Sequence, residues 1–268
     1  MKNILLFELK KSIKPIIFWS IAIIVFNVFM FAFFPLMDQQ QETMDLILKN
    51  YPKEMLQLFG LANAKSLSTL QGYLPFVFIF MQLIIANHAS LVGMKTLSQE
   101  ESERTADFLF SKPISRNQLF ITKIMSNSIE LFAIFLVVVA STHVSLIVFV
   151  KDVAENSEAL SALYISIVLF QGLFFSISLL VSMTTKYVRS TIGYAIGLSF
   201  LMYAMYSIKQ LIDSQWMSYF TPFSYFESAT ILDKAALDTT FVLVAVVLII
   251  SCTLISYLLF KKRDLFII

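Results

Sequence analysis

Polar side chains are rare in the long apolar runs of this sequence, and three of them could do chemistry: Asn87, His88 and Glu130. Ionisable groups inside lipid are costly and often mark proton or ion pathways, so we predict that these residues line a pathway. Asn87 and His88 are the better candidates, because two adjacent polar residues are hard to hide. The simpler role for His88, as for His143, is a neutral imidazole bonded to a Ser or Thr of a neighbouring helix, and that role is favoured.

No catalytic or metal-binding motif accompanies these residues. The six glycines form no G-x-x-x-x-G-K-[ST] phosphate loop, and neither H-E-x-x-H nor G-x-S-x-G occurs. Cys252 is the only cysteine, so it has no partner for an internal disulfide, and no metal-ligand spacing exists. The sequence therefore predicts a chain that is not itself an enzyme and binds no cofactor or metal. Any ATP must be bound by another chain.

Residues 98–110 hold a second group of candidate residues. Ser98 and Glu101 have the spacing of a capping box, which predicts that a helix begins there, and Pro113 ends it. A simple connection does not need such a helix, so the pattern favours docking of a cytoplasmic partner over a solvated helix without one. The residues expected to contact that partner are Glu100, Glu101, Glu103, Arg104, Thr105, Asp107 and Phe108.

A second capping box, Ser115 with Gln118, predicts that the next helix begins near Arg116. A helix from there to Val150 would be about 52 Å long at ~1.5 Å per residue, which exceeds a bilayer core of ~30 Å. Its first turns must therefore stand outside the membrane. The same count places Glu130 at the inner membrane interface, where it can reach water.

The elements that carry these residues are membrane spans. Hydrophobic residues make up 58% of the 268 residues and charged residues 14%, which excludes an ordinary soluble domain. Continuous apolar runs of about 20 residues predict transmembrane helices, because only a helix or a closed barrel satisfies its backbone in lipid. We predict an all-α integral membrane protein, a single domain over residues 1–268, with six spans near 15–37, 73–94, 131–150, 160–183, 191–208 and 239–260.

Charge placement predicts the orientation of these spans. Of the 20 Lys and Arg residues, 14 fall on the side of the membrane that holds the N-terminus, so both termini are expected in the cytoplasm. Residues 1–14 have Leu and Ile on one helical side and Lys on the other, which predicts an interfacial helix. The net charge of +2 gives no footprint for nucleic acid.

An aromatic segment, residues 209–238, precedes the last span. The residues that we assign to a re-entrant segment here are Trp216, Pro222, Phe223 and Tyr225. Amphipathic rings favour the membrane interface, so we predict one or two short helices that re-enter the outer leaflet without crossing it. The alternative is an ordinary folded external loop. In the preceding span, Gly193 and Gly197 have the G-x-x-x-G spacing that lets helices approach closely, which is weak support for helix packing.

The stretch from Glu100 to Arg116 resembles the first cytoplasmic loop of bacterial type-2 ATP-binding-cassette (ABC) permeases. In that family an acidic run and the pattern GT-x-x-x-LL-x-x-P-[IV]-[ST]-R precede the third span, and here Arg104 replaces the common Gly. Residues 221–226, Thr-Pro-Phe-Ser-Tyr-Phe, are similar to the S-P-F-x-Y-F found before the last span of relatives.

The resemblance implies the permease subunit of an ATP-driven exporter in the bacterial cytoplasmic membrane. Two such subunits, identical or paralogous, would form the pathway as a dimer, and each would bind a cytoplasmic ATPase that holds ATP and Mg. Residues 98–110 would be the coupling helix that contacts this ATPase, and 209–238 the re-entrant hairpin.

The Phe-rich spans favour an amphipathic or hydrophobic peptide, such as an antimicrobial peptide, or a lipid-like molecule as cargo. Membrane lipid is the expected surroundings, and nucleic acid is not an expected partner. The alternative function is an ATPase-independent channel, carrier, or immunity or scaffold protein.

Overall fold

The computed structural model describes residues 2–52, 55–56, 66–102, 115–150, 157–185, 190–212, 214 and 216–262. Within these residues the chain is built from helices and their connections, and no strand occurs. The helices are α1 (Lys2–Ala32), α2 (Phe34–Gln39), α3 (Gln41–Asn50), α5 (Leu70–Ser102), α7 (Arg116–Phe149), α8 (Ser157–Thr184), α9 (Thr191–Ile212), the 3-10 helix η2 (Trp216–Phe220), α10 (Pro222–Tyr225), α11 (Ser228–Lys234) and α12 (Thr239–Lys262).

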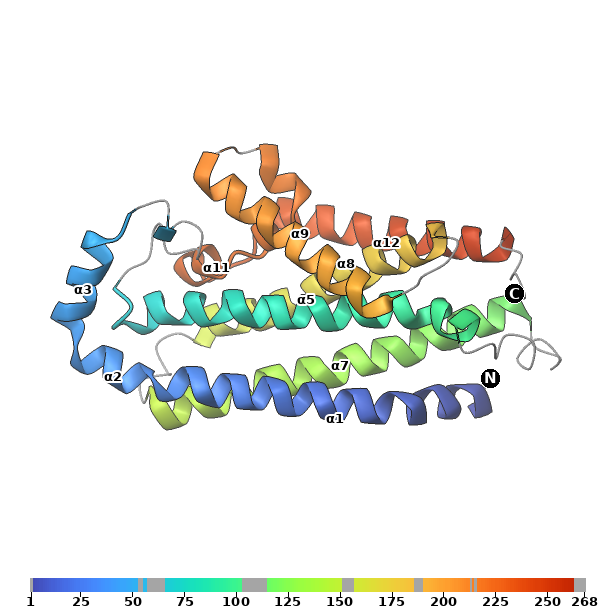
Figure 1. Ribbon diagram of the computed structural model, residues 1–268, viewed down its shortest axis with the longest axis horizontal. Coiled ribbons are helices and arrows are strands. Elements are labelled where there is room, and N and C mark those ends of the chain that lie inside the picture. The colour runs from blue at the N-terminus through green and yellow to red at the C-terminus, as the bar shows by residue number, and fades with distance from the viewer. Residues whose placement is uncertain are drawn as a thin grey trace.

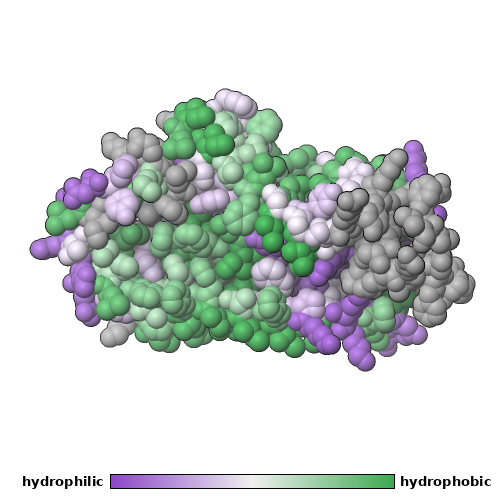
Figure 2. Space-filling view, viewed as in Figure 1, coloured by the Kyte–Doolittle hydropathy of each residue, from purple (hydrophilic) through white to green (hydrophobic). Residues whose placement is uncertain are grey.

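Six helical segments of the described chain are long and apolar enough to cross a membrane, which confirms the predicted fold class. They run over Lys2–Gln39, Leu70–Thr96, Arg116–Phe149, Ser157–Thr184, Thr191–Ile212 and Thr239–Lys262. Apolar side chains dominate the middle of the visible face, and hydrophilic side chains gather toward its two ends (Figure 2). This distribution is the one expected of a protein whose middle lies in lipid.

The long helices form two layers (Figure 1). In the first layer α1 packs along α7, and in the second α5 packs on α8 and α9, with α12 on α8. The beginning of α1 and the end of α12 lie at the same end of the bundle, which we call the terminal end. The opposite end, which carries α2, α3 and α11, is called the distal end.

Two predicted helix boundaries are wrong. Residues 2–14 are helical, but they continue through Pro15 into the first span as one helix rather than forming a separate interfacial helix. The predicted start at Ser98 is likewise the interior of α5, which runs on to Ser102. A change in hydropathy marks a change of surroundings and does not end a helix. A capping box begins a helix only where no preceding turn already bonds the same backbone groups.

The predicted start of the helix that carries the third span, near Arg116, is confirmed. Ser115 caps α7: its hydroxyl accepts a hydrogen bond from the backbone N–H of Gln118 at 3.2 Å. In return, the side-chain oxygen of Gln118 accepts one from the backbone N–H of Ser115 at 3.4 Å. This reciprocal pair satisfies two donors that a helix N-terminus leaves without partners.

The aromatic segment folds into short helices that are too short to span a membrane. After α9 ends at Ile212, the chain forms η2, α10 and α11 before α12 begins. Residues 221–226 of this segment are all buried, against α8, α9 and α12. The segment is therefore part of the packed core at this end and not a loosely attached loop.

Candidate functional site

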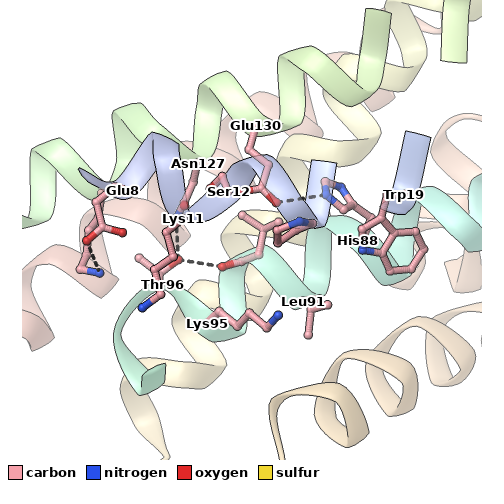
Figure 3. A pocket seen from close by; sticks show the side chains of 13 residues that line it. Glu8, Lys11, Ser12, Trp19, His88, Leu91, Lys95, Thr96, Asn127 and Glu130 are labelled. Carbon is pink, nitrogen blue, oxygen red and sulfur yellow. Dashed lines mark hydrogen bonds and ion pairs between the residues drawn. The ribbon is translucent and has the colours of Figure 1, made fainter. Parts of the chain in front are cut away.

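A polar cavity of about 80 Å³ lies between α1, α5 and α7, toward the terminal end (Figure 3). On each of these helices the lining residues recur every three or four positions, so each helix turns one face toward the cavity. The lining residues are Glu8, Lys11, Ser12, Pro15, Trp19, His88, Leu91, Val92, Lys95, Thr96, Lys123, Asn127 and Glu130.

His88 and Glu130, two of the predicted pathway residues, meet at this cavity. Nε2 of His88 lies 3.4 Å from Oε1 of Glu130, and the two side chains are 0% and 7% exposed. The indole ring of Trp19 packs edge-on against the imidazole, with ring centroids 5.4 Å apart. The side chain that faces His88 is thus a carboxylate rather than the Ser or Thr hydroxyl favoured by the sequence.

Asn87 lies outside the cavity lining, although it neighbours His88 in sequence. Its amide nitrogen donates a hydrogen bond to the carbonyl oxygen of Leu83, 2.9 Å away on the preceding turn of α5. Successive residues of a helix point about 100° apart, so only one member of this adjacent pair faces α7.

A second ion pair closes the cavity nearer the terminal end. Nζ of Lys123 lies 3.4 Å from Oε1 of Glu8, with the two side chains 4% and 13% exposed. Between the two pairs, the amide of Asn127 donates to the Thr96 hydroxyl at 2.8 Å. The polar face of α7 therefore carries a cation, an amide and a carboxylate at intervals of three or four residues.

Sequence reasoning missed Glu8, Lys123 and Asn127 as members of this site. The available signal was the spacing of Lys123, Asn127 and Glu130, which places all three on one face of a helix. Lys123 was used only to assign orientation, and Glu8 was not singled out within residues 1–14. Their partners come from other helices, so the pairing itself is a property of the tertiary packing.

The predicted docking residues fall at and beyond the end of α5. Glu100 and Glu101 belong to its last turns. Glu103, Arg104, Thr105, Asp107 and Phe108 lie outside the described residues. The chain is described again from Ser115, where Arg116 donates a hydrogen bond from Nη1 to the carbonyl oxygen of Lys261 at 3.1 Å. That bond ties the beginning of α7 to the end of α12.

Phe223, from the aromatic segment, is buried among rings of α8 and α9. Its ring centroid lies 5.1 Å from that of Phe170, 5.7 Å from that of Phe174 and 5.6 Å from that of Tyr203. Pro222 is buried beside it at the first position of α10. Trp216, by contrast, is 66% exposed.

Tyr225 joins the aromatic segment to α12. Its ring stacks on Phe241 with centroids 5.2 Å apart and planes 13° from parallel. Its hydroxyl donates to the carbonyl oxygen of Tyr219. Burial, with a smaller contribution from Tyr219, raises the pKa of the Tyr225 hydroxyl, so this donor stays neutral at physiological pH.

Glu227 anchors the aromatic segment to α9 through two donors of α9, and it also accepts from one donor of α11. Its carboxylate accepts hydrogen bonds from the Tyr206 hydroxyl at 3.0 Å, from Nε2 of Gln210 at 2.6 Å and from the Thr230 hydroxyl at 2.9 Å. On the α5 side, the amide of Gln82 donates to the carbonyl oxygen of Phe226 at 2.7 Å. The sequence analysis did not identify this polar anchor.

A second, apolar groove of about 460 Å³ runs along α9 toward the terminal end. Gly193 and Gly197 both line it, so the G-x-x-x-G face of α9 is turned toward the groove. A side chain added at Gly197 would meet nothing of the described chain within 4 Å. The other lining residues are Met94, Val181, Ser190, Tyr194, Leu198 and Leu201.

Within the part of the chain that the structure describes, no group of three or more His, Cys, Asp or Glu side chains could hold a metal ion.

Comparison with known proteins gives one family. The family described as "ABC-2 family transporter protein" matches residues 2–265. No curated protein matches the sequence.

Proposed function

The chain belongs to the ABC-2 family of transporter proteins, and from this membership we infer that it is the permease subunit of an ATP-driven exporter. The observation that carries the proposal is the family match over nearly the whole chain, together with six helices able to span a membrane. The sequence has no phosphate-binding loop of its own, so ATP and Mg are assigned to a separate cytoplasmic ATPase.

We place the contact with this ATPase at residues 98–110, beyond the last span residue of α5. Two features support the assignment. The helix α5 extends past Thr96 to Ser102, and α7 begins at Arg116, about four turns before Glu130. Both extensions point toward the terminal end, which the Lys and Arg distribution assigns to the cytoplasm.

Movement of this contact would reach the spans through α7 and α12. The capping box at Ser115 fixes the first turn of α7, and the bond from Arg116 to Lys261 ties that turn to α12. Movement of residues 98–110 therefore displaces two transmembrane helices, α7 and α12, as well as the loop itself.

A second permease subunit, identical or paralogous, completes the pathway in this proposal. Its support is the large apolar surface that α9 and α12 leave exposed, which includes Phe200, Leu201, Leu243 and Val247. The cargo is proposed to be an amphipathic or hydrophobic peptide, or a lipid-like molecule, because the groove along α9 is lined mostly by apolar side chains. An antimicrobial peptide is the leading candidate.

Copurification tests the docking assignment. The chain is coexpressed with candidate ATP-binding-cassette ATPases, beginning with one encoded by a neighbouring gene, and captured from detergent. The triple variant E100K/E103K/D107K is expected to lose the ATPase and ATP-dependent transport. The matched control D38K/E42K/E158K reverses three acids elsewhere in the sequence, two of them before the second span and one at the start of α8, and is expected to retain both. Normal capture and transport by the first variant would contradict the assignment.

Transport that survives ATP depletion would favour the ATPase-independent alternative.

A further inference from the structure

The two helix layers touch each other much less than the helices within each layer do. The packing of α1 on α7, and of α5 on α8, is extensive, whereas α5 meets α1 and α7 over short stretches. We call the boundary between the α1–α7 layer and the α5–α8–α9–α12 layer the seam. Sparse packing makes a seam the natural place for two rigid groups of helices to move against each other.

Polar side chains supply several of the contacts across the seam. Toward the distal end, the Tyr73 hydroxyl donates to the carbonyl oxygen of Met30. Toward the terminal end, Arg116 of α7 bonds to Lys261 of α12, Asn127 bonds to Thr96, and His88 faces Glu130. Of these contacts, only the last joins two groups that both change charge by taking up a proton.

The His88–Glu130 contact is close but incompletely bonded. The 3.4 Å separation lies within ion-pair range, yet neither ring nitrogen of His88 has hydrogen-bond geometry toward any protein group of the described residues. A buried polar group without a partner costs free energy, and a buried carboxylate without a compensating cation costs more.

The cavity beside the pair gives protons a route to it. One water molecule needs ~10–15 Å³ of such space, so about 80 Å³ accommodates several waters among the polar lining groups. Charged groups face this space from each helix that encloses it: Glu8 and Lys11 on α1, Lys95 on α5, and Lys123 on α7. Lys123 is paired with Glu8, whose carboxylate lies 3.4 Å from its Nζ.

We propose that His88 and Glu130 form a proton-binding pair that latches α5 to α7 across the seam. A proton from cavity water binds Nε2 of His88, and the resulting N–H donates to the Glu130 carboxylate, so the latch is closed by one charge-assisted hydrogen bond. When the proton leaves to the same water, a lone pair of the imidazole faces the carboxylate and the attraction is lost. The seam is then held only by its remaining contacts.

The proton occupancy of the pair can be read directly, because the chain has only two histidines, His88 and His143. The full chain with ¹⁵N-labelled histidine, reconstituted in nanodiscs, is titrated by NMR between pH 5 and pH 8, and H143Q assigns the signals. The proposal requires that an imidazolium signal from His88 appears in this titration. In E130Q the imidazolium signal of His88 is expected to weaken, because the acceptor of the proposed hydrogen bond is gone. The matched control E8Q, which removes a carboxylate bound to Lys123 instead, is expected to have a smaller effect.

The latch itself is tested by spin-label distances in a C252S background. One label on α7, at Ile121, and one on α9, at Ile196, report across the seam, and both sites are exposed. Their distance distribution is expected to shift between pH 5 and pH 8, and to lose this shift in H88Q. Labels at Val25 and Val144, both within the α1–α7 layer, are the control and should not respond.

Three results would overturn the proposal. The first is a His88 that stays neutral from pH 5 to pH 8 in the unsubstituted chain, a measurement that does not depend on any variant folding. The second is an E130Q titration identical to that of the parent. The third is a cross-seam distance that ignores pH while His88 titrates, because a proton would then bind without closing a latch.

Discussion

Arg116 and Lys261 are joined by a hydrogen bond of 3.1 Å from the guanidinium Nη1 to the backbone carbonyl oxygen, although 145 positions separate them in sequence. The last carbonyls of a helix have no partner within it, and a cation near them also stabilises the negative end of the helix dipole. Arg116 is therefore both the first residue of α7 and a cap for α12. It lies at the point where residues 98–110 would pass their movement into the membrane.

Substitution of Arg116 is expected to weaken coupling more than stability. R116Q removes the charge-assisted bond to Lys261 at a half-buried position, so unfolding should become easier by about 1 kcal/mol. If α7 and α12 move together, the variant should bind the ATPase normally but transport less cargo for each ATP hydrolysed. R116K keeps the positive charge but not the planar set of donors. Its transport for each ATP hydrolysed should therefore lie between the values of the parent and of R116Q. An unchanged ratio of transport to ATP hydrolysis in R116Q would show that this bond is only a cap.

Loss of the capping box should loosen the start of α7. S115A removes the acceptor for the Gln118 N–H, which typically costs about 1 kcal/mol, whereas S115T retains a hydroxyl and should cost little. Hydrogen exchange of the first α7 amides measures the effect locally. We expect several-fold faster exchange at the first turn in S115A and nearly parental rates in S115T. Equal rates in both variants would contradict a capping role.

Two glycines should respond in opposite ways to alanine. A Cβ at Gly93 would lie 2.5 Å from the carbonyl oxygen of Phe175 and 2.8 Å from Cβ of Ser178, so α5 and α8 would have to separate. G93A should destabilise the fold by about 1–3 kcal/mol, seen as a lower thermal midpoint in detergent. G197A is the matched control, because its Cβ meets nothing of the described chain within 4 Å. If G197A keeps the thermal midpoint but weakens self-association, the α9 groove receives the second subunit rather than cargo.

The spans were predictable because hydropathy is a local property that lipid enforces on each helix separately. The start of α7 was predictable for a similar reason, since Ser115 and Gln118 cap it through contacts three residues apart. The same rule failed at Ser98, where α5 arrives already helical and no free N-terminus exists for a cap. The predicted division between an interfacial helix over 1–14 and a span from 15 failed as well, because α1 passes through Pro15 as one helix.

The candidate site was only half predictable. His88 and Glu130 stood out singly, because polar residues in apolar sequence are conspicuous. Their meeting depends on how α5 and α7 are rotated and shifted against each other, which the spacing within either helix does not determine. The pairing of Lys123 with Glu8 was hidden for a further reason, since charged residues near span ends are normally read as orientation signals.

The Glu227 anchor gives the last prediction. Its carboxylate accepts from Tyr206, Gln210 and Thr230, so E227A removes three hydrogen bonds to a charged group. Y206F removes one such bond, together with the neutral bond that the Tyr206 hydroxyl accepts from Gln210. Since hydrogen bonds to a charged group contribute ~1.5–3 kcal/mol each, E227A should cost more stability than Y206F by a clear margin. Thermal unfolding of both single variants and of the double variant measures the coupling between the two residues. The double variant is expected to lose less stability than the sum of the two single variants, because both single variants remove the same Tyr206–Glu227 bond. Fully additive losses would instead mean that Tyr206 and Glu227 act independently, and that the aromatic segment is held to α9 by its rings.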